Sequence, residues 1–155
     1  MRQGRIVHVR PIARAFCVFG LLLLFGCSTG PKRVPASGTI ELDGRPLEAG
    51  ILVFDPDVAK GNTARVSCTS PVHNGHFDVQ TAGVERSDTG PGIPLGWYKV
   101  SIRANRPGVP PTFPGQPVLD IDAKYLNPDK TTLEIEIVEN PAPGAYDLKV
   151  TKQAK

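Results

Sequence analysis

The sequence predicts an all-β protein, an antiparallel sandwich of seven short strands that follows an N-terminal signal segment. Three observations support this prediction. Apolar and polar residues alternate with a period of two, two-residue turn signals separate the alternating segments, and helical periodicity is absent after residue 36. Repeated short strands with turn chemistry between them are typical of antiparallel sandwiches.

The N-terminal segment is basic and then apolar. Four arginines precede an uncharged run over residues 15–25, and the small residue Gly26 stands directly before Cys27. A positive region, an apolar region of this length and a small residue at the cleavage point describe a secretory signal. The run is too short to span a bilayer core, which needs about 20 apolar residues. An uncleaved membrane anchor and a plain secretory signal with a chance cysteine are the alternatives.

The end of this segment, Leu24-Phe25-Gly26-Cys27, resembles the lipobox of bacterial lipoproteins, in which Leu, a small residue and Gly or Ala precede Cys. The resemblance implies cleavage between Gly26 and Cys27, a diacylglycerol on the Cys27 sulfur and acylation of the new amine. The bilayer is then a partner through acylated Cys27.

This interpretation divides the chain into a lipoprotein signal peptide (1–26), a lipidated N-terminus with a flexible tether (27–36) and one domain (37–155). Residues 28–36 contain two prolines and no periodic apolar pattern, which is why we expect a tether. The 129 residues from Cys27 onward are enough for one compact domain and too few for two ordinary ones.

Removal of the signal peptide changes the charge of the chain. Four of its 18 basic residues but none of its 15 acidic residues precede Cys27, so the mature chain has a net charge of about −1. A basic surface of the kind that nucleic-acid-binding proteins need is therefore absent, and we expect no nucleic-acid partner. Cys68 remains as a single thiol, so the domain depends on its hydrophobic core rather than on a disulfide.

The alternating segments define the expected strands in chain order. They lie at 39–42, 51–54, 64–68, 77–79, 98–103, 133–137 and 146–150. The segment 51–54 is wholly apolar, as in a strand that is buried on both faces.

The connections carry their own signals. Asp43-Gly44 and Asn74-Gly75 predict two-residue hairpin turns, because such turns need positive φ angles. Residues 82–95 and 105–118 are long Gly- and Pro-rich loops, and 120–127 predicts a short helical turn.

Five segments together resemble bacterial carboxypeptidase-regulatory-like domains. They lie at 37–47, 50–54, 74–77, 93–100 and 123–135, and they include an Asp-Gly turn followed by Pro-Leu and a Pro-x-Gly-x-Tyr-x-Val pattern. The resemblance implies a transthyretin-like (prealbumin-like) β-sandwich. Such modules are generally non-catalytic and occur beside enzymes or alone on the cell envelope. The family has no established functional residues, so none is carried over.

Trp97 is the strongest candidate for a binding residue. If Tyr98, Val100 and Ile102 point inward, Trp97 points outward beside Gly96. An exposed Trp is a typical anchor for protein partners or sugar rings. The alternative is that Trp97 covers the rim of the sandwich or packs against a loop.

The other candidate residues favour structural roles. His73 and His76 bracket a turn and face each other, but two ligands make a poor metal site. Cys68 follows the alternation of Ala64 and Val66 and is expected in the core. The carboxylate pairs Asp55 with Asp57 and Asp120 with Asp122, and the Pro111–Pro114 motif, are expected in solvated loops.

These observations predict a non-catalytic protein without metal or cofactor, because the sequence has no recognisable triad or ligand set. We expect an envelope lipoprotein, lipid-anchored at the outer membrane or periplasmic face, whose domain is an interaction or structural module. Envelope proteins and glycans are the candidate partners. The alternative function is a carbohydrate- or peptide-binding module that uses Trp97 and the long loops.

Overall fold

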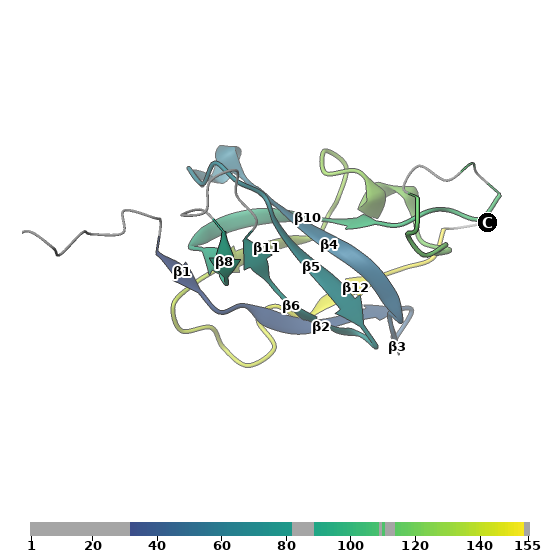
Figure 1. Cartoon of the computed structure of the whole chain (residues 1–155), viewed down its shortest axis with the longest axis horizontal. Helices are drawn as coiled ribbons and strands as arrows, with labels where there is room; N and C mark the ends of the chain where they lie inside the picture. Colours follow the sequence, from purple (N-terminus) through teal and green to yellow (C-terminus); the bar gives the residue numbers. More distant parts are fainter. Residues whose placement is uncertain (1–31, 82–88, 109, 111–113, 154–155) are drawn as a thin grey trace, which may run out of the picture.

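The domain is all-β in the computed structural model, which describes residues 32–81, 89–108, 110 and 114–153 (Figure 1). No α-helix occurs within these ranges. The two helical segments are short 3₁₀ turns, η2 (Val58–Lys60) and η4 (Ala123–Leu126). The strands are β1 (Arg33–Val34), β2 (Ser37–Leu42), β3 (Arg45–Pro46), β4 (Ala49–Pro56), β5 (Cys68–His73), β6 (His76–Asp78), β7 (Gln80–Thr81), β8 (Gly90–Pro91), β9 (Ile93–Pro94), β10 (Gly96–Arg103), β11 (Glu134–Ile137) and β12 (Leu148–Val150).

Most of these strands form one curled sheet. Its main path runs β11-β10-β4-β5-β6-β2-β12, with β3, β7 and β8 attached beside it, and β1 pairs separately with β9. The pairs are antiparallel except for β12, which lies parallel to β2. The expectation of a wholly antiparallel arrangement is therefore wrong at this edge. The chain reaches β12 from β11 through a loop, not a tight hairpin, and such a connection allows either strand direction.

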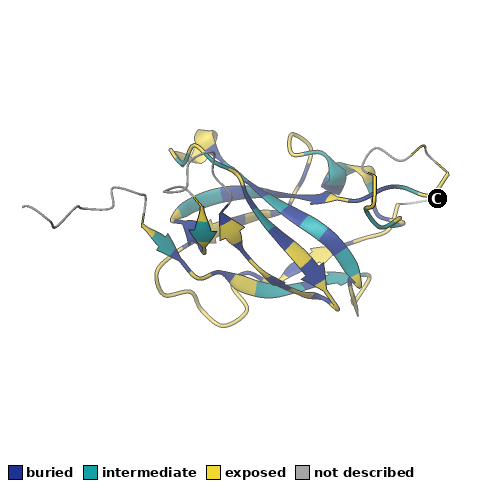
Figure 2. Cartoon of the chain, in the orientation of Figure 1, coloured by how far each residue is buried: buried dark blue, intermediate teal, exposed yellow. Residues whose placement is uncertain are grey.

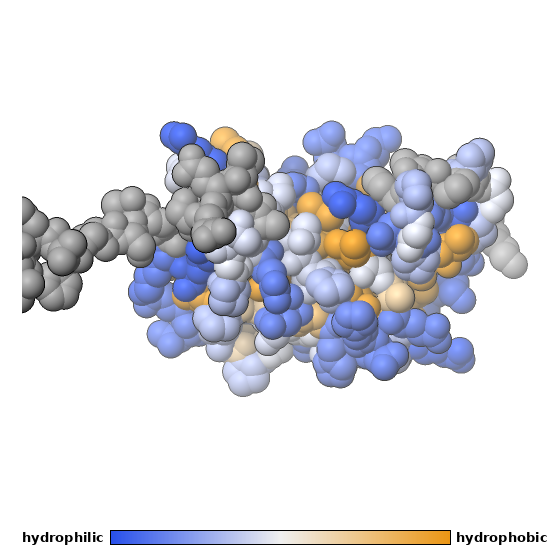
Figure 3. All heavy atoms as spheres, in the orientation of Figure 1, coloured by the Kyte–Doolittle hydropathy of each residue, from blue (hydrophilic) through white to orange (hydrophobic). Residues whose placement is uncertain are grey.

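Alternation along the central strands builds the core. Leu52 and Phe54 of β4 and Tyr98 and Val100 of β10 are fully buried, while Val53 between them is half-buried on the other face (Figure 2). The predicted double-sided burial of 51–54 is thus only partial. On the face of the molecule shown in Figure 3, hydrophilic residues predominate around small apolar patches.

Both predicted hairpin turns are present. Asp43 and Gly44 have φ angles of 50° and 76°, and Asn74 and Gly75 have 50° and 77°. Each turn leaves two residues between paired positions, with Leu42 opposite Arg45 in the first case. The predicted helical turn is η4, which ends before Pro128.

The strand expected at 64–68 begins only at Cys68 and continues to His73. Residues 62–67 are irregular because the buried Asn62 side chain binds the backbone there, with the Ala64 amide donating to its Oδ1 at 2.9 Å. Apolar alternation in this segment therefore reflects partial burial and not strand pairing.

The last residues of the predicted tether are part of the folded domain. Arg33–Val34 pairs with Pro94 and Ile93 of β9, and Val34 and Ala36 are buried in the core. Residues 33–36 therefore belong to the folded domain.

Candidate functional site

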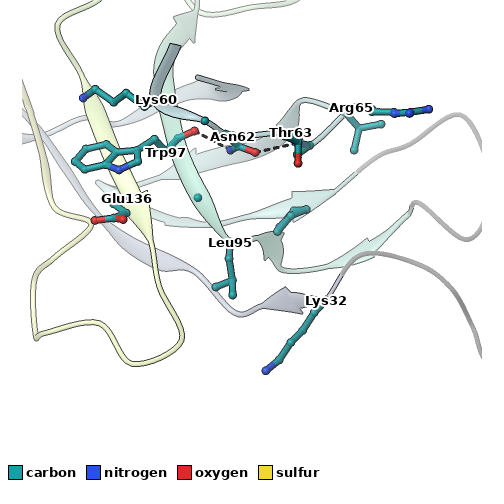
Figure 4. Close-up of a pocket in the computed structure, with 13 residues that line it drawn as sticks. Lys32, Lys60, Asn62, Thr63, Arg65, Leu95, Trp97 and Glu136 are labelled. Carbon is teal, nitrogen blue, oxygen red and sulfur yellow. Dashed lines mark hydrogen bonds between the residues drawn. The ribbon is translucent and has the colours of Figure 1, made fainter. Parts of the chain in front are cut away.

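An open hollow of about 700 Å³ lies where β10 begins (Figure 4). We call it the Trp97 hollow. It is lined by Lys32, residues 60–66, residues 94–97 and Glu136. The lining comes from four separate parts of the chain, and it includes the point at which the described chain begins.

Trp97 lies on β10 opposite Glu136 of β11, on the face of the strand away from the core. Its backbone carbonyl is held twice, since it accepts from the Asp57 amide at 2.9 Å and from Asn62 Nδ2 at 2.7 Å. The Trp97 side chain is half-buried, between the exposed anchor and the rim-covering residue that the sequence left as alternatives. The outward direction predicted from the alternation is confirmed.

Lys60 covers one face of the indole. Its Nζ lies 4.0 Å from the ring centroid, a distance at which a cation is attracted to the π-system. The same Nζ is 2.5 Å from Glu134 Oε2. Figure 4 shows the indole between the side chains of Lys60 and Glu136. Part of the Trp97 surface is thus already used within the domain, and the rest borders the hollow.

Asn62 joins the two walls of the hollow. Its buried side chain binds β10 through Trp97 and its own segment through Ala64. Gly96 faces it with a φ of 128°, and a Cβ at that position would lie 3.0 Å from the Asn62 amide. Glycine is therefore needed here for both conformation and close approach. Sequence reasoning missed Asn62 and Lys60, because no local pattern links them to a strand more than 30 residues away.

The two histidines are on the surface of the β5–β6 hairpin. His73 and His76 are register partners and both are exposed, as predicted. No group of three or more His, Cys, Asp or Glu side chains suited to a metal occurs within the described part of the chain.

Cys68 is fully buried, and its core position is confirmed. Its Sγ lies 3.3 Å from Thr81 Oγ1, which in turn donates to the Gly92 carbonyl at 2.6 Å. Burial raises the pKa of the thiol, and the hydrogen bond with Thr81 offsets part of this rise. A nucleophilic thiol needs the opposite shift, so this arrangement is structural.

Three of the four acids in the predicted carboxylate pairs accept local hydrogen bonds, and the fourth, Asp120, is exposed as predicted. Asp57 is buried and caps η2, accepting from the Ala59 amide at 3.1 Å, and Asp122 caps η4 through the Lys124 amide at 3.0 Å. Asp55 accepts from the Ser67 hydroxyl at 2.5 Å. The sequence had predicted that Asp57 is a solvated loop acid. This prediction is wrong, because Asp57 is buried.

Several predicted features lie outside the described residues. They are Cys27, the signal peptide and residues 111–113 of the Pro-rich motif. Within the ranges that the structure describes, no helix is both long enough and apolar enough to cross a bilayer.

No protein-family model, no curated protein and no solved structure matches this chain.

Proposed function

We propose that this chain is an exported lipoprotein, anchored in the membrane through acylated Cys27. Its folded part is a transthyretin-like β-sandwich that acts as a non-catalytic interaction module at the cell envelope. The observation that carries the proposal is the Leu24-Phe25-Gly26-Cys27 segment at the end of a basic and then apolar leader.

The curled sheet supports the fold assignment. Each of the seven predicted strands has a counterpart on the path β11-β10-β4-β5-β6-β2-β12, although the third is displaced toward the C-terminus. The buried apolar side chains form one hydrophobic core, to which β2, β4, β5, β10 and β12 all contribute.

The contacts of the polar side chains support a non-catalytic role. Asp57 and Asp122 cap the N-termini of η2 and η4, and the Cys68 thiol is buried and has a raised pKa. A catalytic acid, base or nucleophile must instead be available to a substrate with a pKa suited to its task.

Mass spectrometry of the mature N-terminus, purified from membranes, tests the anchor. We expect a first residue of Cys27 that carries the mass of a diacylglycerol and an acyl chain. A Cys27→Ala variant should lack the lipid and leave the membrane fraction or remain unprocessed. A native protein that is freely soluble, begins upstream of residue 27 and has no acyl mass would contradict the proposal.

A second candidate function is recognition of a carbohydrate or peptide. The observation that favours it is the Trp97 hollow, whose aromatic wall and polar rim are common in ligand sites. A glycan array probed with the detergent-solubilised mature protein tests this function, with Trp97→Ala as the comparison. If the unaltered protein and the Trp97→Ala variant bind glycans equally, or if neither binds any, carbohydrate recognition through Trp97 is excluded.

A further inference from the structure

Exposed apolar side chains are concentrated at one end of the domain. In the described ranges, the large hydrophobic residues with more than a third of their surface exposed are Val58 (78%), Leu95 (38%), Val118 (62%) and Val138 (36%). One of these four lines the Trp97 hollow, and two others are next in the sequence to residues that pair with or bond to its lining. Leu95 lines it, Val138 follows the position paired with Gly96, and Val58 follows Asp57, which bonds to Trp97.

We call this region, formed by Val58, Leu95, Val138 and the Trp97 hollow, the Trp97 end. Figure 1 shows that η2, β1 and the start of β10 lie at this end, away from the C-terminus. Solitary apolar residues on a surface need no explanation, but several exposed apolar side chains at the end of the domain that holds a half-buried Trp favour contact with another apolar phase.

The chain enters the folded domain at the Trp97 end. Lys32 lines the hollow, and β1 pairs with β9 directly before Leu95. Five residue steps separate Cys27 from Lys32 in the sequence. Whatever their conformation, these steps span at most about 18 Å. An acyl anchor at Cys27 therefore holds the hollow within that distance of the headgroups.

The charged side chains that line the hollow are three basic residues and the acidic Glu136. Lys32, Lys60 and Arg65 line the hollow. Arg65 is exposed and has no ion pair within the described ranges, while Lys32 pairs with Glu139 and Lys60 with Glu134. Both lysine pairs are at least one-third exposed, so they are weak and can be exchanged for lipid phosphates. Trp flanked by Lys and Arg is typical of side chains at a membrane–water interface.

We propose that the Trp97 end is a lipid-docking surface, with its apolar side chains among the headgroups and Lys32, Lys60 and Arg65 facing lipid phosphates. The proposal rests on the acyl anchor of the proposed function and adds an orientation to it. The anchor retains the protein at the membrane, and the docking surface fixes which end of the domain faces the bilayer.

The fluorescence of Trp97 tests this orientation directly, because Trp97 is the chain's only tryptophan. The mature lipidated protein is reconstituted into vesicles of phosphatidylethanolamine and phosphatidylglycerol, with or without bromine near the ester end of the acyl chains. We expect a blue shift of the emission on reconstitution, a loss of intensity with brominated lipid and protection from aqueous iodide.

A variant with Trp97→Phe and Val118→Trp is the matched control. Val118 is 62% exposed and bridges to Asn105, beyond the far end of β10. The eight residues of β10 place it roughly 25 Å from the Trp97 end. Its tryptophan should be quenched by iodide and spared by brominated lipid.

Two results would overturn the docking surface while leaving the anchor in place. One is an acylated, vesicle-bound protein in which Trp97 and Trp at position 118 respond alike to both quenchers. The other is a Trp97 emission maximum that does not change on addition of lipid but shifts on addition of soluble oligosaccharide. That result would indicate that the hollow binds a glycan. Failure of the anchor itself is a separate result, because such a protein lacks acyl mass and does not float with vesicles.

Discussion

Two neighbouring residues on β10, Trp97 and Tyr98, show how a single strand serves both the core and the surface. Tyr98 is fully buried, and its hydroxyl donates to the Pro94 carbonyl at 3.0 Å, so the polar atom has a partner inside the core. Trp97 turns the other way and is held by its backbone, under Lys60. The core therefore fixes the direction in which the candidate binding residue points.

Tyr98 makes stability fall at high pH. Burial raises the pKa of Tyr98 to about 12, from an ordinary value of 10.0. Between these values the unfolded chain loses the phenol proton while the folded protein keeps it. The contribution of neutral Tyr98 to the free energy of unfolding is thus fully present below pH 10. It is lost as the pH rises toward 12, and the loss amounts to about 3 kcal/mol at most. Urea denaturation across this range measures the loss. In Tyr98→Phe the slope should be much smaller, and an unchanged slope would assign it to other groups.

Cys68 should resist thiol reagents as long as the domain is folded. Its side chain is fully buried and the pKa of the thiol is raised, so both access and thiolate formation are suppressed. Ellman's reagent should therefore label it only in denaturant. Ser67→Cys is the matched control, because residue 67 is exposed and its thiol should react at once. Rapid stoichiometric labelling of the unaltered folded protein would show that the thiol is accessible.

At the scale of elements, the two predicted hairpin turns have the same backbone but different surroundings. Gly44 has open space where a Cβ would lie, whereas a Cβ on Gly75 would lie 2.7 Å from the Pro46 side chain. The second turn is therefore a packing contact as well as a change of direction, and it joins the β5–β6 hairpin to β3.

This difference predicts unequal effects of the same substitution. Gly44→Ala should cost about 1–2 kcal/mol of unfolding free energy, the cost of a left-handed φ for an L-residue. Gly75→Ala should cost about 1–3 kcal/mol more, because Pro46 must also move. Chemical denaturation of both variants measures the difference. Equal losses would mean that the turn at Gly75 relaxes without disturbing Pro46.

The elements that the sequence predicted well include β2 and β10, in which apolar and polar residues alternate, whereas β4 was predicted from a wholly apolar run. The strand β5 was predicted at 64–68 from the alternation of Ala64, Val66 and Cys68, but it runs from Cys68 to His73 and includes Pro71, a residue that is unusual in a central strand. The structure accommodates Pro71 where the ladder is interrupted between β6 and β7. There Ser70 Oγ donates to the Asp78 carbonyl at 2.6 Å and accepts from its amide at 2.9 Å. A side chain thus replaces the missing backbone bonds, which no local pattern reveals.

The candidate site was only half predictable for the same reason. Alternation gave the direction of Trp97, but Asn62, Lys60 and Lys32 reach it through tertiary contacts from distant segments. Likewise β1 is too short to show a period, and it is identifiable as a strand only once β9 is beside it. Residues 33–36 were predicted to be part of a tether because the segment contains two prolines and no apolar period.

At the scale of the whole molecule, the last strand ties the two ends of the described chain into one body. The strand β12 pairs with β2, and Asp147 accepts from both the amide and the hydroxyl of Thr39 at 2.9 and 2.8 Å. The Thr39 hydroxyl and then its amide lower the pKa of Asp147. Because these contacts join β12 to β2, the acyl anchor proposed at Cys27 would orient the C-terminal strand together with the N-terminal part of the domain.

The length of the tether should therefore control that orientation. Insertion of 20 Gly and Ser residues between Gly30 and Pro31 adds a flexible segment with an average reach of roughly 25 Å. The local concentration of lipid at the Trp97 end then falls, although the acyl anchor is unchanged. We expect the protein with the insertion to remain in the membrane fraction, while brominated lipid quenches Trp97 less than in the unaltered protein.

An insertion of two residues is the control, since it barely changes the reach of the tether and should leave the quenching unchanged. Full quenching with the long insertion would mean that the Trp97 end binds lipid strongly enough to need no help from the tether.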